Sequence, residues 1–247
     1  MLFFILGAII GSFLNVVIVR TPNNESIITP RSHCPKCNQM IPFYYNIPIL
    51  SYIILNGKCI SCKKNISIQY IFIEIFTGVL FYIVLGLFPL NEAILLLIVF
   101  CSLIVLSMID ISHLLIPTYS IVILYILIIP KIFIYDQNLI DIVFGSIVSI
   151  LYLAIPSLLL AIIKKNKDVI GFGDILLSGF VGSWLGSISG ILCLFLASII
   201  GIVFFIYLRL IDEKTKLLRI PFGACISISF IIIVIIEEWY KFKLFFF

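Results

Sequence analysis

The chain has 247 residues, of which 63% are hydrophobic and only 11% are charged, and its mean hydropathy is +1.29. Soluble domains carry about a quarter charged residues, so this composition excludes a soluble globular protein. The net charge of +4 includes no block of like charges and no interleaved basic and aromatic residues, which argues against a nucleic-acid partner. Long apolar stretches without alternating strand patterns indicate an all-α polytopic membrane protein, since only helices and closed barrels satisfy the backbone in lipid.

Eight stretches are candidate transmembrane helices, and the first of them is interpreted as a retained span. It lacks a basic start and a small-residue cleavage site, which argues against a signal peptide. The sixth is short and rich in glycine, which predicts a tilted helix, a thinner membrane or a merger with its neighbour. The approximate ranges are 1–19, 68–88, 93–115, 118–135, 140–163, 175–190, 191–210 and 222–238. The expected organisation is a first span over 1–19, a loop domain over 20–67 and a helical bundle over 68–247.

The loop over 20–67 contains two Cys-x-x-Cys pairs with 21 residues between them. The four cysteines are Cys34, Cys37, Cys59 and Cys62. Four thiolates can surround one tetrahedral ion, and structural zinc sites are built in this way. The spacing, slightly longer than usual for paired knuckles, predicts a structural zinc that orders a loop too small for a core of its own. Free thiols or a redox pair are the alternative, and His33 is expected to be solvated rather than a ligand.

Three acidic residues, Glu74, Asp110 and Asp174, fall at or near membrane depth with few basic neighbours. An ionisable group inside a bilayer costs about 2.5–3.5 kcal/mol on insertion scales, so each acid is a candidate functional residue. Asp174 follows Gly171 and Gly173, whose backbones permit the close approach of another chain. The turn over 171–174 is therefore a place where an extended substrate can lie.

The distribution of Lys and Arg predicts the orientation of the chain, because cytoplasmic loops carry an excess of both residues. If the N-terminus is outside, the cytoplasmic stretches 20–67, 164–174 and 209–221 contain 13 of the 16 basic residues. In this topology Asp110 and Asp174 lie at the cytoplasmic ends of their spans. Two acids that are far apart in the sequence are thus expected to meet at one membrane face.

A pair of neighbouring carboxyl groups holds one proton, because both cannot ionise at low cost. The charged member can deprotonate a water while the protonated member hydrogen-bonds a scissile carbonyl, which is the chemistry of an aspartic peptidase. The alternative is purely structural: Asp174 caps the sixth span, and Asp110 pairs with His113 one turn later.

Several motifs, in their order along the chain, carry a resemblance to a known family. They are "GSFLNVVIVRTP" at 11–22, "CPKC" at 34–37, "NIPILSYIILNGKCISC" at 46–62, "YIFIEIFTG" at 70–78, "DISHLLIP" at 110–117, "GFGD" at 171–174, "VGSWLG" at 181–186 and "IPFGA" at 220–224. Nearly end to end, the chain resembles the type IV prepilin peptidases, which are GxGD aspartic membrane proteases.

The resemblance implies an aspartic endopeptidase of the bacterial inner membrane that serves type IV pilus and type II secretion systems. It implies that Asp110 and Asp174 are catalytic, that the four cysteines are the family's tetrad and that Glu74 is a family glutamate. Taken on its own, Glu74 is equally compatible with a helix-interior acid that pairs with Asn15 or a nearby backbone group. The implied substrates are prepilins and pseudopilins, which have a short basic leader and an apolar helix lying in the bilayer. Cleavage is expected after a glycine, at the cytoplasmic face.

Many members of the family also N-methylate the newly exposed residue, with S-adenosylmethionine as the methyl donor. No glycine-rich dinucleotide-type turn follows a strand in this sequence, so the motifs do not indicate where the donor binds.

The chain departs from the family's pattern at four positions. The family usually has an acid where Thr118 stands, lysine where Leu176 stands, and proline at Ile71 and Ala224. No aspartate or cysteine is lost, so the implied hydrolysis is retained.

Three other hypotheses stay open. The first is a related GxGD intramembrane protease without methyltransferase activity, which only substrate data can distinguish from a prepilin peptidase. A proton-coupled transporter would place its acids near the bilayer midplane in broken helices, whereas these acids fall at span ends. The third is an assembly scaffold without enzymatic activity, and the paired aspartates argue against it.

Overall fold

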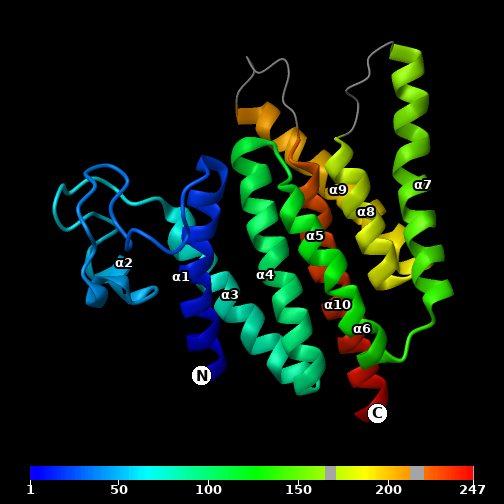
Figure 1. Ribbon diagram of the computed structural model, residues 1–247, viewed down its shortest axis with the longest axis horizontal. Coiled ribbons are helices and arrows are strands. Elements are labelled where there is room, and N and C mark those ends of the chain that lie inside the picture. The colour runs from blue at the N-terminus through cyan, green and yellow to red at the C-terminus, as the bar shows by residue number, and fades with distance from the viewer. Residues whose placement is uncertain (165–170, 212–219, 247) are drawn as a thin grey trace. The chain divides into compact units, whose positions relative to one another are not determined.

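The computed structural model describes residues 1–164, 171–211 and 220–246. Within these ranges the regular elements are helices, and the extended pairing consists of isolated bridges in the cysteine loop. The helices are α1 (Leu2–Arg20), α2 (Leu50–Ile54), α3 (Ile68–Leu87), α4 (Leu90–His113), α5 (Thr118–Ile126), α6 (Ile128–Tyr135), α7 (Leu139–Lys164), α8 (Phe172–Leu185), α9 (Ser187–Ile211) and α10 (Phe222–Phe246), with 3-10 turns η1 (Thr21–Asn23) and η2 (Phe43–Asn46) (Figure 1).

Seven segments of the described chain are long and apolar enough to cross a membrane, and α5 and α6 together form one of them. The eighth apolar helix, α8, has 14 residues and occupies the sixth predicted range, where the sequence is short and rich in glycine. These helices confirm the predicted all-α multi-pass membrane fold. Residues 165–170 and 212–219, which belong to two of the stretches predicted to be cytoplasmic, lie outside the described residues.

The chain divides into two compact units, Met1–Ala93 and Ile94–Phe247. The first unit contains α1, the cysteine loop and α3. In this unit α1 packs on α3 through small residues, as helices in a membrane commonly do. A Cβ on Gly7 would lie 2.6 Å from the Thr77 carbonyl oxygen, and one on Gly78 would lie 2.7 Å from the Phe4 ring. Glycine at these positions is therefore what allows the two backbones to approach.

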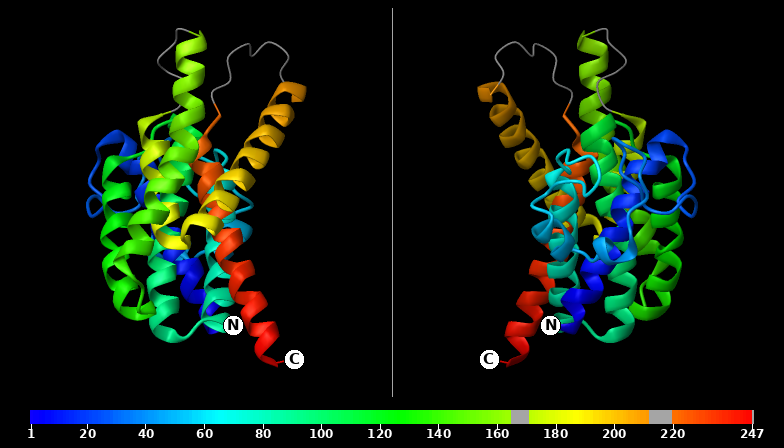
Figure 2. Two further views of the ribbon diagram at one scale, coloured as in Figure 1. Left: turned by 90° about the vertical axis from the view of Figure 1, so that its right-hand side faces the viewer. Right: turned by 90° about the vertical axis from the view of Figure 1, so that its left-hand side faces the viewer.

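The second unit is organised around α8, which packs against α5, α7, α9 and α10 (Figure 2). Phe180 of α8 is fully buried, and its ring contacts Tyr125, Trp184 and Phe230 at centroid distances of 5.6–6.2 Å. The Nζ of buried Lys131 lies 5.0 Å from the Trp184 ring centroid and donates to the Trp184 carbonyl. These contacts hold α8 at both its middle and its C-terminal end.

Candidate active site and metal centre

The last turn of α4 and the first turns of α8 and α10 meet at one end of the second unit (Figure 1). Asp110, in that last turn of α4, is only 5% exposed. Its Oδ2 accepts a hydrogen bond from the backbone N–H of Ala224 across 3.0 Å. Because α10 begins at Phe222, the Asp110 carboxylate lies at the positive N-terminal end of that helix, where free N–H groups favour an anion.

Gly223 is what allows Asp110 to reach α10. A Cβ at this position would lie 3.0 Å from Asp110 Oδ2 and 2.7 Å from Ile116 Cδ1. Both contacts are closer than a real Cβ makes without displacing its neighbour, so a larger residue would push the Asp110 carboxylate from the Ala224 N–H.

Asp174 is the third residue of α8, whose N-cap is Gly171. The Asp174 carboxylate accepts a hydrogen bond from the backbone N–H of Gly171, in the manner of the acidic residue of a capping box. Asp174 is half-buried, whereas Asp110 is buried, so the side of the pair that carries Asp174 is the more accessible one.

The two carboxyl groups are close enough to interact electrostatically. Ile116, in the connection between α4 and α5, packs against both helix starts: a Cβ on Gly173 would lie 2.9 Å from Ile116 Cβ, and Gly223 contacts the other end of this side chain. Asp174 does cap its helix, as the structural alternative proposed. The Asp110 carboxylate, however, accepts hydrogen bonds from the backbone N–H groups of Ala224 and Gly223 rather than pairing with His113. The structure thus brings the two predicted acids into one site.

Sequence reasoning missed the roles of Ile116, Gly223 and Ala224 in this site. The only signal in the sequence is that Gly223 and Ala224 belong to the "IPFGA" motif, in which Ala224 stands where the family usually has proline. Proline has no N–H, so alanine at this position adds a second backbone donor for Asp110 beside the Gly223 N–H.

The four cysteines of the loop form a single cluster, and their sulfur atoms all lie within 4.8 Å of one another. The Sγ atoms of Cys34 and Cys62, and those of Cys37 and Cys59, are 4.0 Å apart, and all four thiols are free. A tetrahedron with Zn–S bonds of about 2.3 Å has edges of about 3.8 Å. The cluster therefore fits a metal ion of this kind.

The two halves of the cluster repeat one backbone geometry. The Cys34 N–H donates to the Gln39 carbonyl, and the Cys59 N–H donates to the Lys64 carbonyl, at 3.0 and 2.9 Å. In each half the residue that follows the second cysteine has a positive φ, 56° at Asn38 and 57° at Lys63. Such turns direct backbone N–H groups at the sulfur atoms.

Hydrogen bonds from the backbone N–H groups of Cys62 and Ser61 lower the pKa of the Cys59 thiol to about 6. Metal binding requires the thiolate form, so this part of the loop is already suited to a cation. His33 lies outside the cluster, where its Nδ1 is 3.2 Å from the Arg31 carbonyl oxygen.

Glu74 of α3 is 8% exposed, and its Oε2 accepts a hydrogen bond from the Ile49 N–H across 2.7 Å. The sequence left open whether Glu74 pairs with Asn15 or with a nearby backbone group. The observed donor is a backbone N–H, and it belongs to the cysteine loop rather than to α3. Asn15, the other option, uses its amide group to donate to the Tyr70 carbonyl.

Comparison with known proteins matches both parts of the chain. The description "Bacterial Peptidase A24 N-terminal domain" covers residues 5–88, and "Type IV leader peptidase family" covers residues 97–206. A type 4 prepilin-like proteins leader peptide-processing enzyme from Escherichia coli is 33% identical, over 90% of this chain and 88% of that protein.

Two further relatives are both called prepilin leader peptidase/N-methyltransferase. The one from Neisseria gonorrhoeae is 33% identical, over 91% of this chain and 86% of that protein. The one from Myxococcus xanthus is 43% identical, but over 46% of this chain and 34% of that protein. No solved structure has a significant match to the chain.

Proposed function

This chain belongs to the type IV leader peptidase family, and from that premise we propose that it removes the leader peptides of prepilins by aspartic catalysis. The observation that carries the proposal is that Asp110, held at the first turn of α10, and Asp174, in the first turn of α8, are close enough to interact electrostatically. This chemistry needs no catalytic metal and no serine or cysteine nucleophile, because a carboxyl pair can activate water.

In the proposed reaction the two carboxyl groups share one proton. The ionised member takes a proton from the attacking water, and the protonated member donates a hydrogen bond to the scissile carbonyl oxygen. The same groups then return a proton to the leaving amine. The Ala224 N–H holds one carboxylate in place during these steps, and the Gly171 N–H holds the other.

Access for an extended substrate is supported by the glycine turn. Gly171 and the following Phe172 are exposed, and Gly173 packs against Ile116. A peptide strand needs close approach to the enzyme backbone, which glycine permits.

The proposed topology has the N-terminus outside and the aspartates at the cytoplasmic face of the inner membrane. It is supported by the concentration of Lys and Arg in the stretches 20–67, 164–174 and 209–221. A basic prepilin leader is retained on the cytoplasmic side by the same charge rule, which brings its cleavage site to the two aspartates.

The ion proposed for Cys34, Cys37, Cys59 and Cys62 is Zn²⁺ in a structural role. All four positions of a tetrahedral ion would be filled by sulfur, which leaves none open for a reacting water. Its chemical contribution when bound is to cross-link the two halves of the loop.

The second proposed activity is transfer of a methyl group from S-adenosylmethionine to the amine that cleavage exposes. It is supported by the names of the relatives, two of which are peptidase/N-methyltransferases. A peptidase without this activity remains the competing reading.

One experiment tests both activities. The purified protein is incubated in lipid with a prepilin and S-adenosylmethionine, and the mature product is weighed by mass spectrometry. Loss of the leader together with a gain of one CH2 is the expected result. Loss of the leader alone would restrict the function to proteolysis, and an intact prepilin would remove the proposal.

A further inference from the structure

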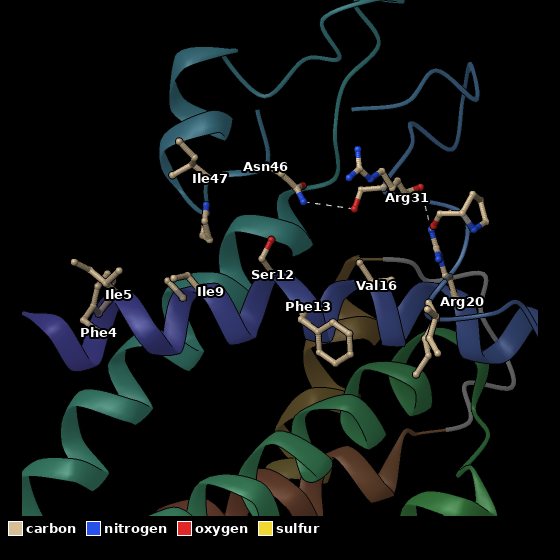
Figure 3. A pocket seen from close by; sticks show the side chains of 16 residues that line it. Phe4, Ile5, Ile9, Ser12, Phe13, Val16, Arg20, Arg31, Asn46 and Ile47 are labelled. Carbon is tan, nitrogen blue, oxygen red and sulfur yellow. Dashed lines mark hydrogen bonds between the residues drawn. The ribbon is translucent and has the colours of Figure 1, made fainter. Parts of the chain in front are cut away.

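A cavity of about 610 Å³ lies in the first unit, between one face of α1 and the cysteine loop (Figure 3). Ligand cavities are typically about 300–1,000 Å³. The lining of this cavity, the α1 groove, changes along the helix: Figure 3 shows Phe4 and Ile5 toward the N-terminal end of α1, and Arg20 and Arg31 at the other end. Neither the two aspartates nor the four cysteines line it. The proposed peptidase chemistry therefore makes no use of this groove.

The apolar part of the α1 groove is a stripe along one side of the helix. Ile5, Ile9 and Phe13 follow one another at steps of four residues, which places them on one helix face, and each is 45–53% exposed. From Ile5 to Val16 the stripe is about 17 Å long at a rise of 1.5 Å per residue. Half of the hydrocarbon core of a bilayer is about 15 Å thick. The stripe is therefore long enough to lie beside an acyl chain through one leaflet.

The other end of the α1 groove contains a buried positive charge. Arg20, the last residue of α1, is only 6% exposed. Its guanidinium donates to the Ser26 and Pro30 carbonyl oxygens, both across 2.8 Å, and these contacts fix its position without neutralising its charge. No carboxylate pairs with Arg20 among the residues that the structure describes. Buried charges in proteins are normally paired with an opposite charge, so this end is suited to an anionic ligand.

Arg31 adds a second positive charge to the same end of the groove. Its side chain is exposed and belongs to the lining, as does the Asn46 amide group, which donates to the Ser32 hydroxyl across 3.5 Å. Within the described part of the chain, no aspartate or glutamate lines the groove. Two guanidinium groups without an acid beside them favour a phosphate, which arginine binds through charge-assisted hydrogen bonds.

The loop that carries Arg31 also presents apolar side chains at this end. Ile27 and Ile28 line the groove and are 43% and 83% exposed. The Ser26 hydroxyl oxygen accepts hydrogen bonds from the Ile28 and Thr29 N–H groups, each across 3.3 Å, which orders the turn. Exposed isoleucines beside arginines are typical of a segment that contacts a membrane surface. This composition indicates that the basic end of the groove lies at the level of the lipid headgroups.

We propose that the α1 groove binds an anionic phospholipid, whose phosphate lies beside Arg20 and Arg31. One of its acyl chains lies along the apolar stripe of α1. A zwitterionic headgroup would bring its own cation next to the arginines, so an anionic lipid is preferred. An apolar segment of the substrate fits the groove less well, because the basic leader expected beside it would be repelled by the same arginines. The proposal does not depend on either catalytic activity.

Lipid selectivity, measured on the full-length protein, tests the proposal. The protein is released from nanodiscs that contain equal amounts of phosphatidylglycerol and phosphatidylcholine, and the lipids that stay bound are counted by native mass spectrometry. The unmodified protein should retain phosphatidylglycerol with a preference of about tenfold. Arg31→Gln should reduce that preference about fivefold, which is roughly what one basic residue contributes to the binding of anionic lipid.

Arg209→Gln, which replaces an exposed arginine of α9 outside the groove, is the matched control and should keep the preference. An equal loss in both variants would mean that the attraction is general to the basic surface, and it would overturn the proposal. An unchanged preference in Arg31→Gln, or no preference in the unmodified protein, would do the same. Because Arg31 is exposed, its substitution leaves the packing of the unit intact.

Crosslinking locates the acyl chain without any substitution. A phosphatidylglycerol with a diazirine in one acyl chain should label peptides from α1, and excess phosphatidylglycerol should displace the label whereas excess phosphatidylcholine should not. Equal displacement by both lipids would assign the contact to ordinary bulk lipid and overturn the proposal. Displacement of the label by a prepilin would assign the groove to the substrate instead.

Discussion

The Oδ2 of Asp110 and the backbone N–H of Ala224 are 3.0 Å apart, and this hydrogen bond joins the end of α4 to the start of α10. It places a buried carboxylate on a helix N-terminus, 114 residues away in the chain. The same end of the unit carries Asp174 on the N-terminus of α8.

Replacing either aspartate by asparagine should abolish leader cleavage. Asp110→Asn and Asp174→Asn preserve the shape of the side chain but cannot share a titrating proton, so we expect a loss of about 10²–10⁴-fold in cleavage rate. The measurement is the initial rate of prepilin processing by each purified variant. Asp141→Asn, at the exposed start of α7, is the control and should process normally. Normal cleavage by either site variant would exclude the carboxyl pair as the catalyst.

Ala224→Pro removes the N–H that Asp110 accepts, and proline is tolerated in the first turn of a helix. The Gly223 N–H also donates to Asp110 and remains in this variant, and proline is the family's usual residue at this position. One hydrogen bond contributes about 0.5–1.5 kcal/mol, so kcat should fall by about 3–10-fold with little change in KM. Ala224→Gly retains the N–H and serves as the control. Steady-state kinetics on a prepilin peptide gives both constants. Wild-type kcat in the proline variant would mean that this contact does not position the carboxylate.

Gly223→Ala should lower cleavage for a steric reason, because the new Cβ would lie 3.0 Å from Asp110 Oδ2 and 2.7 Å from Ile116 Cδ1. Ile116→Val removes the Cδ1 atom, so the double variant should recover part of the activity. A double-mutant cycle on the cleavage rate measures this coupling, which for residues in contact is typically about 0.5–3 kcal/mol. Additive effects of the two substitutions would contradict the packing described for Ile116.

Removing the metal should destabilise the cysteine loop. Cys37→Ser, or treatment with a strong zinc chelator, should release the bound ion and lower the thermal unfolding midpoint of the protein, because four thiolates hold the loop together through that ion. Elemental analysis of the purified protein and a thermal scan provide the measurements. Cys101→Ser, in α4 and outside the cluster, should retain the metal. Purified wild-type protein without zinc or iron would rule out the metal site.

The sequence was sufficient for the features that depend on local composition. The spans could be located because crossing a bilayer requires an unbroken run of about 20 apolar residues, which is visible in one dimension. The cysteine cluster could also be predicted from the sequence. Two Cys-x-x-Cys pairs that lie in one short loop are necessarily near one another in space, and one metal ion can bind all four thiolates. The charge bias predicted that the ends carrying Asp110 and Asp174 share a face, and the structure brings these two acids together.

Only the tertiary structure decided which backbone groups hold the acids. The backbone donors for Asp110 are the N–H groups of Gly223 and Ala224, and the backbone donor for Glu74 is the N–H of Ile49. Every residue except proline carries the same N–H, so neither hydropathy nor motif spacing distinguishes one from another. Which donor is free depends on where a helix begins or a turn reverses, and which acid it meets depends on how distant helices pack. Those are properties of the packed chain, and the chemistry proposed for Asp110 and Asp174 depends on them.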